Sequence, residues 1–268
     1  MPDNDGNVAA PRPPTSLERT LRYDRWLIAA ALGFVTLLCW AWLVPMAHDM
    51  YGPMDGPSAW MMTTTWDTRH VLLLWTMWAV MMAAMMLPSA SPLLLLYGES
   101  LRRRSDGETG LSRVYAMAAG YLLVWLIFSA VATGLQRVLS ELLLLTPMME
   151  AARPEAAAGL LLLAGLYQLT PLKRACLGAC RSPLSFLASR WRPGAGGAVR
   201  MGVAHGLSCL GCCWALMLLL FAGGVMNLHV IAALTVLVLV EKLAPFGMQS
   251  SRVTGVVLIA AGSWILMG

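Results

Sequence analysis

The sequence predicts an all-α protein, a polytopic bundle of six to seven transmembrane helices with its N-terminus in the cytoplasm. The chain is 58% hydrophobic and only 12% charged, and its mean hydropathy of +0.66 is far above that of a soluble domain. Apolar runs close to the roughly 20 residues that cross a bilayer recur along its length. These runs predict spans at residues 25–45, 71–96, 113–136, 154–171, 201–222, 225–242 and 251–267.

The two ends of this series set the domain boundaries and the number of spans. The first run is too long for the core of a signal peptide, and no small-residue cleavage site follows it, so it is counted as a true span. The polar, proline-rich start predicts a disordered cytoplasmic segment at residues 1–20, with one transmembrane domain at 21–268. The fourth and the last two spans are short and the turn at 222–228 is tight, so the count is given as six to seven.

Loop charges predict the orientation. Basic residues gather before the first span, between the second and third, and between the fourth and fifth: Arg12, Arg19, Arg22, Arg25, Arg102, Arg103, Arg104, Arg113, Lys173, Arg174, Arg181, Arg190, Arg192 and Arg200. The positive-inside rule places these loops in the cytoplasm and, with seven spans, the C-terminus outside. The net charge of +5 is therefore a signal of topology, and no nucleic-acid partner is expected.

The fifth span contains the strongest candidate site: His205, Cys209, Cys212 and Cys213. An α-helix turns about 100° per residue, so offsets of 0, 4, 7 and 8 share one face. Polar groups at this depth in a membrane are costly and usually functional. Soft sulfur with nitrogen suits Cu(I), zinc or an iron–sulfur centre, so this face predicts a metal site, with a redox-thiol site as the alternative.

Three further residues are expected near the same leaflet. Cys176 and Cys180 follow the fourth span, and Glu241 ends the sixth. In a reducing cytoplasm, clustered cysteines indicate ligands or exchange thiols more than structural disulfides, although a single transmembrane cysteine usually serves only in packing. For Glu241, three interpretations stay open: an interfacial ion pair with Lys242, a carboxylate ligand, or a proton acceptor.

Methionine forms the second pattern, with nineteen in the chain. His48, Met50 and Met54 fall in an expected outer loop, where thioether and imidazole groups would capture Cu(I), or where His48 and a carboxylate would hold Cu(II). In the second span, a stripe at four-residue spacing would relay a soft cation inward: Met77, Met81 and Met85. The alternative for the stripe is core filling by an adaptable apolar side chain.

The strings YQLTPLKRACL (167–177) and HGLSCLGCCW (205–214) resemble a bacterial family catalogued only as predicted metal-binding integral membrane proteins. The similarity covers roughly residues 70–265. It implies a multi-pass protein of the bacterial inner membrane whose Cys and His positions bind metal: Cys176, His205, Cys209, Cys212 and Cys213. Glu241 and Lys242 match the EK pair of the same family. The methionine loop lies outside it, so copper follows from the residues themselves.

The sequence thus predicts a membrane copper-handling protein acting in uptake or delivery, with Cu(I) as the metal and zinc or iron as alternatives. The expected partners are the lipid bilayer, the metal ion, and a metallochaperone or acceptor membrane complex. A membrane thiol–disulfide carrier, a metal-dependent redox enzyme and an assembly subunit remain alternatives. GxSxG, HExxH and GxxxxGK[ST] do not occur, so the chain contains no motif of a lipase, zinc protease or ATP-driven pump.

Overall fold

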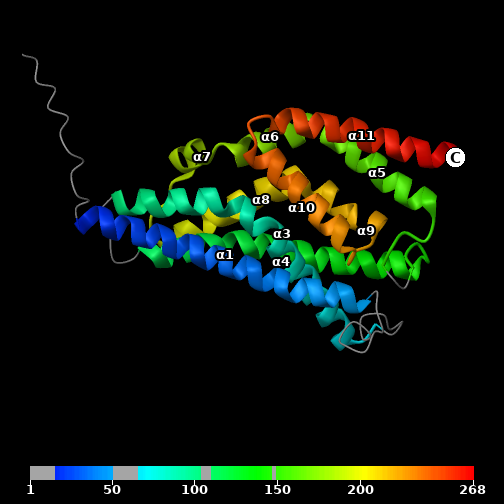
Figure 1. Ribbon diagram of the computed structural model, residues 1–268, viewed down its shortest axis with the longest axis horizontal. Coiled ribbons are helices and arrows are strands. Elements are labelled where there is room, and N and C mark those ends of the chain that lie inside the picture. The colour runs from blue at the N-terminus through cyan, green and yellow to red at the C-terminus, as the bar shows by residue number, and fades with distance from the viewer. Residues whose placement is uncertain (1–15, 51–65, 104–109, 147–148) are drawn as a thin grey trace, which may run out of the picture.

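The computed structural model describes residues 16–50, 66–103, 110–146 and 149–268 (Figure 1). These residues are almost wholly helical, and their one β-type pairing is an isolated bridge between Leu145 and Ala151. The predicted all-α fold is confirmed.

Long helices form the body of the molecule: α1 (Ser16–Met50), α3 (Thr68–Arg103), α4 (Gly110–Glu141), α8 (Gly194–Leu218) and α11 (Gly247–Met267). Shorter helices complete it: α5 (Pro154–Gln168), α6 (Pro171–Arg181), α7 (Pro183–Arg190), α9 (Leu220–Gly223) and α10 (Leu228–Leu243). Prolines inside α1 and α3 are accommodated, as they are in other helices that pack among apolar neighbours.

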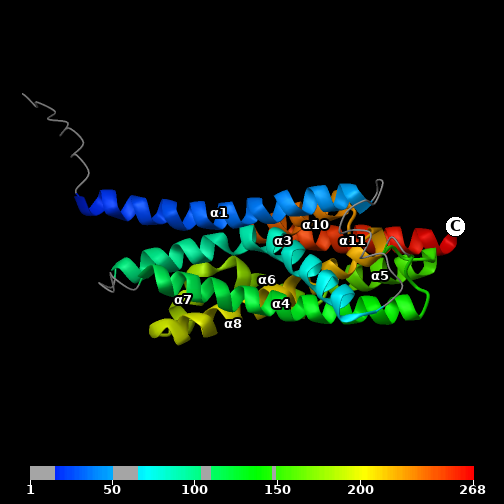
Figure 2. The ribbon, with the colours of Figure 1, turned by 90° about the horizontal axis from the view of Figure 1, so that it is seen from below.

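The chain runs back and forth along the long axis of the molecule. Both views place the start of α1 and the end of α11 at opposite ends of that axis (Figures 1 and 2). The start of α1, the end of α3 and helix α7 share one end, while the C-terminus lies at the other. Termini at opposite ends are expected of an odd number of passes.

Glycine allows α8 to lie directly against α4 at the centre of the bundle. A Cβ atom added to Gly202 would lie 2.0 Å from the carbonyl oxygen of Met117, and one added to Gly120 would lie 2.3 Å from that of Val199. Small residues at such crossings let two backbones touch, which drives helix association where the surroundings are apolar. A similar approach joins α5 to α11, where a Cβ on Gly165 would lie 2.8 Å from the oxygen of Gly255.

The number of spans is the part of the predicted fold that changes. Within the part of the chain that the structure describes, five helical segments are long and apolar enough to cross a membrane: the last 26 residues of α1, then α3, α4, the α8–α9 segment and α11. Helices α5 and α6 form a pair bent by 66° that would count as a sixth span. The expected span at 225–242 is instead the 16-residue helix α10. It begins at Leu228 because Asn227 caps it, accepting hydrogen bonds from the backbone N–H groups of His229 and Val230.

Two expected segments lie partly outside the described residues. Helix α1 begins at Ser16, within the segment expected at 1–20, and residues 1–15 are not described. At its other end α1 continues to Met50, so the prediction that this stretch is a loop was wrong for residues 46–50. The reason is packing, since Met46, Ala47 and Met50 are buried against the bundle.

Candidate metal centre

The face of α8 predicted to carry the site is buried. His205, Cys209, Cys212 and Cys213 are each at most 5% exposed, because α8 is covered by α4 on one side and α6 on another. The apolar residues on both sides of these positions extend the helix, and the glycines hold it close to α4, so the sulfur atoms lie in the protein interior.

Cys209 is the most highly connected of the cysteines. Lys242 of α10 directs its Nζ atom to Cys209 Sγ at 2.8 Å. A hydrogen bond of 3.0 Å joins the same sulfur to the hydroxyl group of Tyr121 on α4. The Tyr121 hydroxyl also lies 3.1 Å from the carbonyl oxygen of Met86, so its single hydrogen is donated either to that oxygen or to the sulfur. Lys242 Nζ donates to Ser89 Oγ at 3.2 Å, so α3 completes the surroundings.

This environment favours a thiolate. Among the described residues, Lys242 makes no ion pair with a carboxylate, and its close contacts are Cys209, Ser89 and Met86. A buried ammonium group requires a counter-charge, and a thiolate at 2.8 Å supplies one. Thiolates, and not thiols, act as nucleophiles and metal ligands.

A second pair of thiols joins α8 to α6. Cys212 Sγ lies 4.0 Å from Cys180 Sγ. Thiolate–metal bonds of about 2.3 Å place two sulfurs on one ion about 3.8 Å apart at a tetrahedral angle and about 4.6 Å apart in a linear arrangement. The observed separation falls between these values, so this pair fits one soft ion without a change in backbone.

The remaining cysteines of the cluster point elsewhere. Cys213 Sγ donates to the carbonyl oxygen of Cys209, as does Cys212 Sγ. Cys176 packs its sulfur against Gly211, where an added Cβ would lie 2.7 Å from it. Gly211 therefore leaves room for a sulfur atom, and Gly206 packs against Tyr121 and Val124 of α4.

His205 lies in an aromatic cage. Its ring stacks on Tyr121 at 5.6 Å between centroids and meets the ring of Phe186 edge-on at 5.4 Å. Its Nδ1 atom is buried without a hydrogen-bond partner. Because buried polar atoms are nearly always satisfied, an orphaned imidazole nitrogen is a position where a ligand would be stabilised.

Glu241 is committed to other partners. Its carboxylate pairs with Lys173 at 2.6 Å and accepts a hydrogen bond from Gln168 at 2.8 Å, both from the α5–α6 segment. Arg181 donates to its backbone oxygen at 2.6 Å. The interpretation of Glu241 and Lys242 as an ion pair was wrong, because the two side chains diverge to opposite partners. The Gln168 hydrogen bond joins α5 to α10.

The methionine stripe faces the interior. Met77, Met81 and Met85 are fully buried in α3, as are Met82 and Met86. Its inner end reaches the cysteine site, where Met86 Sδ lies 3.9 Å from Lys242 Nζ. Both core filling and a thioether route are compatible with this burial.

Two of the expected collecting residues, His48 and Met50, differ in exposure. His48 is exposed near the end of α1, while Met50 is buried at 1% exposure. Met54 lies outside the described residues. The premise that these methionines are exposed is wrong for Met50, which has a packing role.

Among the residues that the structure describes, no three His, Cys, Asp or Glu side chains converge to form a metal site. His205, Cys209 and Cys212 do share one face of α8, but each has different partners. Cys209 contacts Lys242, Cys212 contacts Cys180, and His205 lies in its aromatic cage. Sequence reasoning did not identify Tyr121, Lys173 and Lys242 as partners in this network. The two lysines carried a usable signal, because a charge at the end of an apolar run requires a counter-charge.

Comparison with known proteins gives the family. The family model described as copper chaperone, PpoB2, matches residues 75–265, which is well over half of the chain and includes every residue of the cysteine cluster. No curated protein and no solved structure matches. The chain therefore belongs to the PpoB2 copper chaperone family.

Proposed function

We propose that this protein is a multi-pass membrane copper carrier that holds Cu(I) between Cys180 and Cys212. The observation that carries the proposal is the 4.0 Å separation of these two sulfurs, on helices that the chain brings together from 32 residues apart. Thiolate ligands select soft ions such as Cu(I), and Cu(I) is stable with only two of them. The family assignment and the long apolar helices support copper and a membrane setting.

Charge balance gives Lys242 a role in the same site. Cu(I) with two thiolates has a net charge of −1, which is costly in a low-dielectric interior. The ammonium group of Lys242, held beside Cys209 at 2.8 Å, would offset this charge while the Cys209 sulfur carries its proton, and would offset the Cys209 thiolate once the ion has left the pair. We assign to Cys209 the role of a third sulfur that exchanges with the pair as copper arrives or leaves.

The route to this site follows α3. Copper captured near His48 and Met54 would pass along the thioethers of Met77, Met81 and Met85 to Met86, beside Lys242. Thioethers bind Cu(I) without deprotonation and without adding charge, so they bind it more weakly than thiolates do. Cys176, half-buried on α6, would then present the ion to a chaperone or membrane acceptor.

The test is copper stoichiometry. The wild type and a Cys180→Ser/Cys212→Ser variant are purified in mild detergent, loaded with Cu(I) under reducing conditions, desalted, and assayed by elemental mass spectrometry. The wild type should retain about one copper per chain and the variant much less. Cys39→Ser is the matched control, because Cys39 lies on α1, away from the cluster, and should retain wild-type copper.

Two results would overturn the proposal. One is equal copper in the wild type and the double variant, and the other is retention of zinc or iron in preference to copper when all three are offered. Circular dichroism and gel filtration of each variant distinguish loss of copper from loss of folding.

A membrane thiol–disulfide carrier is the second candidate, and the same pair of sulfurs favours it. Cys180 and Cys212 would become a disulfide as an incoming protein disulfide is reduced to two thiols, so electrons and protons balance. Titration of free thiols in the protein as isolated, with and without reductant, separates the candidates. Two thiols that appear only after reduction, together with no bound copper, would favour the carrier.

A further inference from the structure

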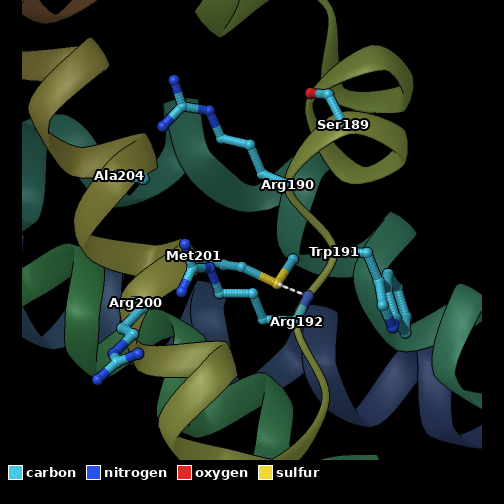
Figure 3. A pocket seen from close by; sticks show the side chains of 7 residues that line it. All are labelled: Ser189, Arg190, Trp191, Arg192, Arg200, Met201 and Ala204. Atoms are coloured by element: carbon cyan, nitrogen blue, oxygen red, sulfur yellow. Dashed lines mark hydrogen bonds between the residues drawn. The ribbon is translucent and has the colours of Figure 1, made fainter.

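A cavity of about 890 Å³ lies where α7 leads into α8, apart from the cysteine cluster. It is lined by Ser189, Arg190, Trp191, Arg192, Arg200, Met201 and Ala204 (Figure 3). Three of these seven residues are arginines. Ligand cavities of this size, about 300–1,000 Å³, are typical of small-molecule sites.

The walls of this cavity are fixed by packing. Trp191 lies against the ring of Tyr97 on α3, with centroids 5.4 Å apart. The backbone N–H of Arg192 donates to Met201 Sδ at 3.3 Å, which ties the connecting segment to α8. In Figure 3, Arg190 and Arg192 extend from this segment toward α8, and Trp191 points away on the opposite side.

The positive charge in this cavity has no carboxylate counter-charge among the described residues. Among the described residues, no carboxylate forms an ion pair with Arg190, Arg192 or Arg200, although other arginines of the chain do pair with glutamates. The Arg190 guanidinium lies over the ring of Phe186, 5.9 Å from its centroid. Guanidinium groups present paired donors that match phosphate oxygens, so the cavity fits a phosphate-bearing anion.

The surface next to the cavity indicates that the anion is amphiphilic. Arg200, Ala204 and Leu207 are spaced at offsets of 0, 4 and 7 and therefore share one face of α8. Leu207 is 56% exposed on that face. A free phosphate would gain nothing from an exposed leucine, whereas a lipid would place its phosphate among the arginines and an acyl chain along the helix.

The geometry points to a binding site for an anionic phospholipid, with the headgroup phosphate held by Arg192 and Arg200 and supported by Arg190. Basic pockets between membrane helices recognise such headgroups. This site is independent of copper, since it shares no residue with Cys180, Cys209 or Cys212.

Native mass spectrometry tests the site. Purified protein in detergent is offered equal amounts of phosphatidylglycerol and phosphatidylcholine, with and without excess inorganic phosphate. The wild type should bind phosphatidylglycerol in preference by about tenfold or more, as two charge-assisted contacts would give. The Arg192→Gln/Arg200→Gln variant should lose this preference. The control variant Arg174→Gln/Arg252→Gln should keep it, because it removes the same charge from exposed positions on α6 and α11.

Arg190 is left intact in these variants because it packs on Phe186, which contacts His205. If the Arg192→Gln/Arg200→Gln variant does not fold, the wild type is instead crosslinked to phosphatidylglycerol that carries a photoreactive headgroup. The label should then map to residues 189–204. The inference would be overturned if the wild type bound both lipids equally, or if the folded Arg192→Gln/Arg200→Gln variant kept the wild-type preference. It would also be overturned if the photoreactive lipid labelled residues elsewhere, or if inorganic phosphate displaced the lipid. Equal binding of both lipids would leave an acidic protein partner as the candidate ligand.

Discussion

The sulfur of Cys209 lies among side chains from three other helices, and its position explains how a membrane interior can stabilise a thiolate. Lys242 supplies the charge, the Tyr121 hydroxyl lies within hydrogen-bond distance of the sulfur, and Ser89 holds the lysine in place. Cys209, Tyr121 and Lys242 are buried and Ser89 is half-buried, so the interactions of the sulfur act in surroundings of low dielectric constant, where they are stronger than in water.

Lys242→Met should weaken copper retention while the helices remain folded. Removal of one partner from a buried charge pair leaves the other uncompensated, so we expect Cu(I) affinity to fall by about tenfold or more. Competition with a chromophoric Cu(I) chelator measures the affinity. Arg174→Met, which removes an exposed charge from α6, should have no effect, and an unchanged affinity in Lys242→Met would remove Lys242 from the copper site.

The Glu241–Lys173 pair is expected to act in stability. Glu241→Gln should lower the free energy of unfolding by about 3–5 kcal/mol, because Lys173 would stay buried without a counter-charge. The double variant Lys173→Met/Glu241→Gln should lose less than Glu241→Gln alone, since neither charge remains. Unfolding in detergent measures both.

The exposed Arg137–Glu141 pair is the control, and Glu141→Gln should cost less than about 1 kcal/mol. Equal losses for Glu241→Gln and Glu141→Gln would contradict a structural role for the buried pair.

At the scale of elements, the crossing of α8 over α4 sets the position of the cysteine face. The backbones touch at Gly202 and Gly120, so the Cys209 sulfur, about two turns beyond Gly202, is held at a fixed position against Tyr121. Neighbouring α6 then brings Cys180 to Cys212.

Gly202→Ala should separate these helices. Its Cβ would lie 2.0 Å from the Met117 carbonyl oxygen, which must move, and overpacking of this kind costs about 1–3 kcal/mol or more. Gly134→Ala on α4 meets open space and should be neutral or stabilising by up to about 1 kcal/mol. Thermal unfolding of the two variants gives the comparison, and equal melting temperatures would show that the crossing tolerates a methyl group.

The sequence predicted those features that depend on local periodicity. A helix of fixed turn angle was sufficient to place His205, Cys209, Cys212 and Cys213 on one buried face. The contacts between Lys242 and Cys209, and between Cys180 and Cys212, depend on how separate helices pack, which one sequence does not encode in a readable pattern. Helix ends were missed for a similar reason, since the end of α1 is stabilised by burial of Met50 and the start of α10 by its cap.

At the scale of the whole molecule, the helices place the arginine-lined cavity toward one end of the long axis. The start of α1, helix α7 and the arginine-lined cavity lie toward one end of the long axis, and the C-terminus lies at the other (Figures 1 and 2). The positive-inside rule predicts that the arginine-rich end faces the cytoplasm.

Reporter fusions test this orientation. A phosphatase that is active only outside the cytoplasm should be active after Gly268 and inactive before Ser16, because the two positions lie at opposite ends of the molecule. A fluorescent protein that folds only in the cytoplasm should give the reverse pattern. The same reporter active at both termini would contradict an odd number of crossings.

The most direct test of the copper site is X-ray absorption at the copper edge of Cu(I)-loaded protein. The spectrum should show copper bonded to two or three sulfur atoms in the wild type and in Cys39→Ser, with loss of sulfur neighbours in Cys180→Ser/Cys212→Ser. Copper bonded mainly to nitrogen or oxygen, or a sulfur shell unchanged in that double variant, would show that the ion is held elsewhere in the chain.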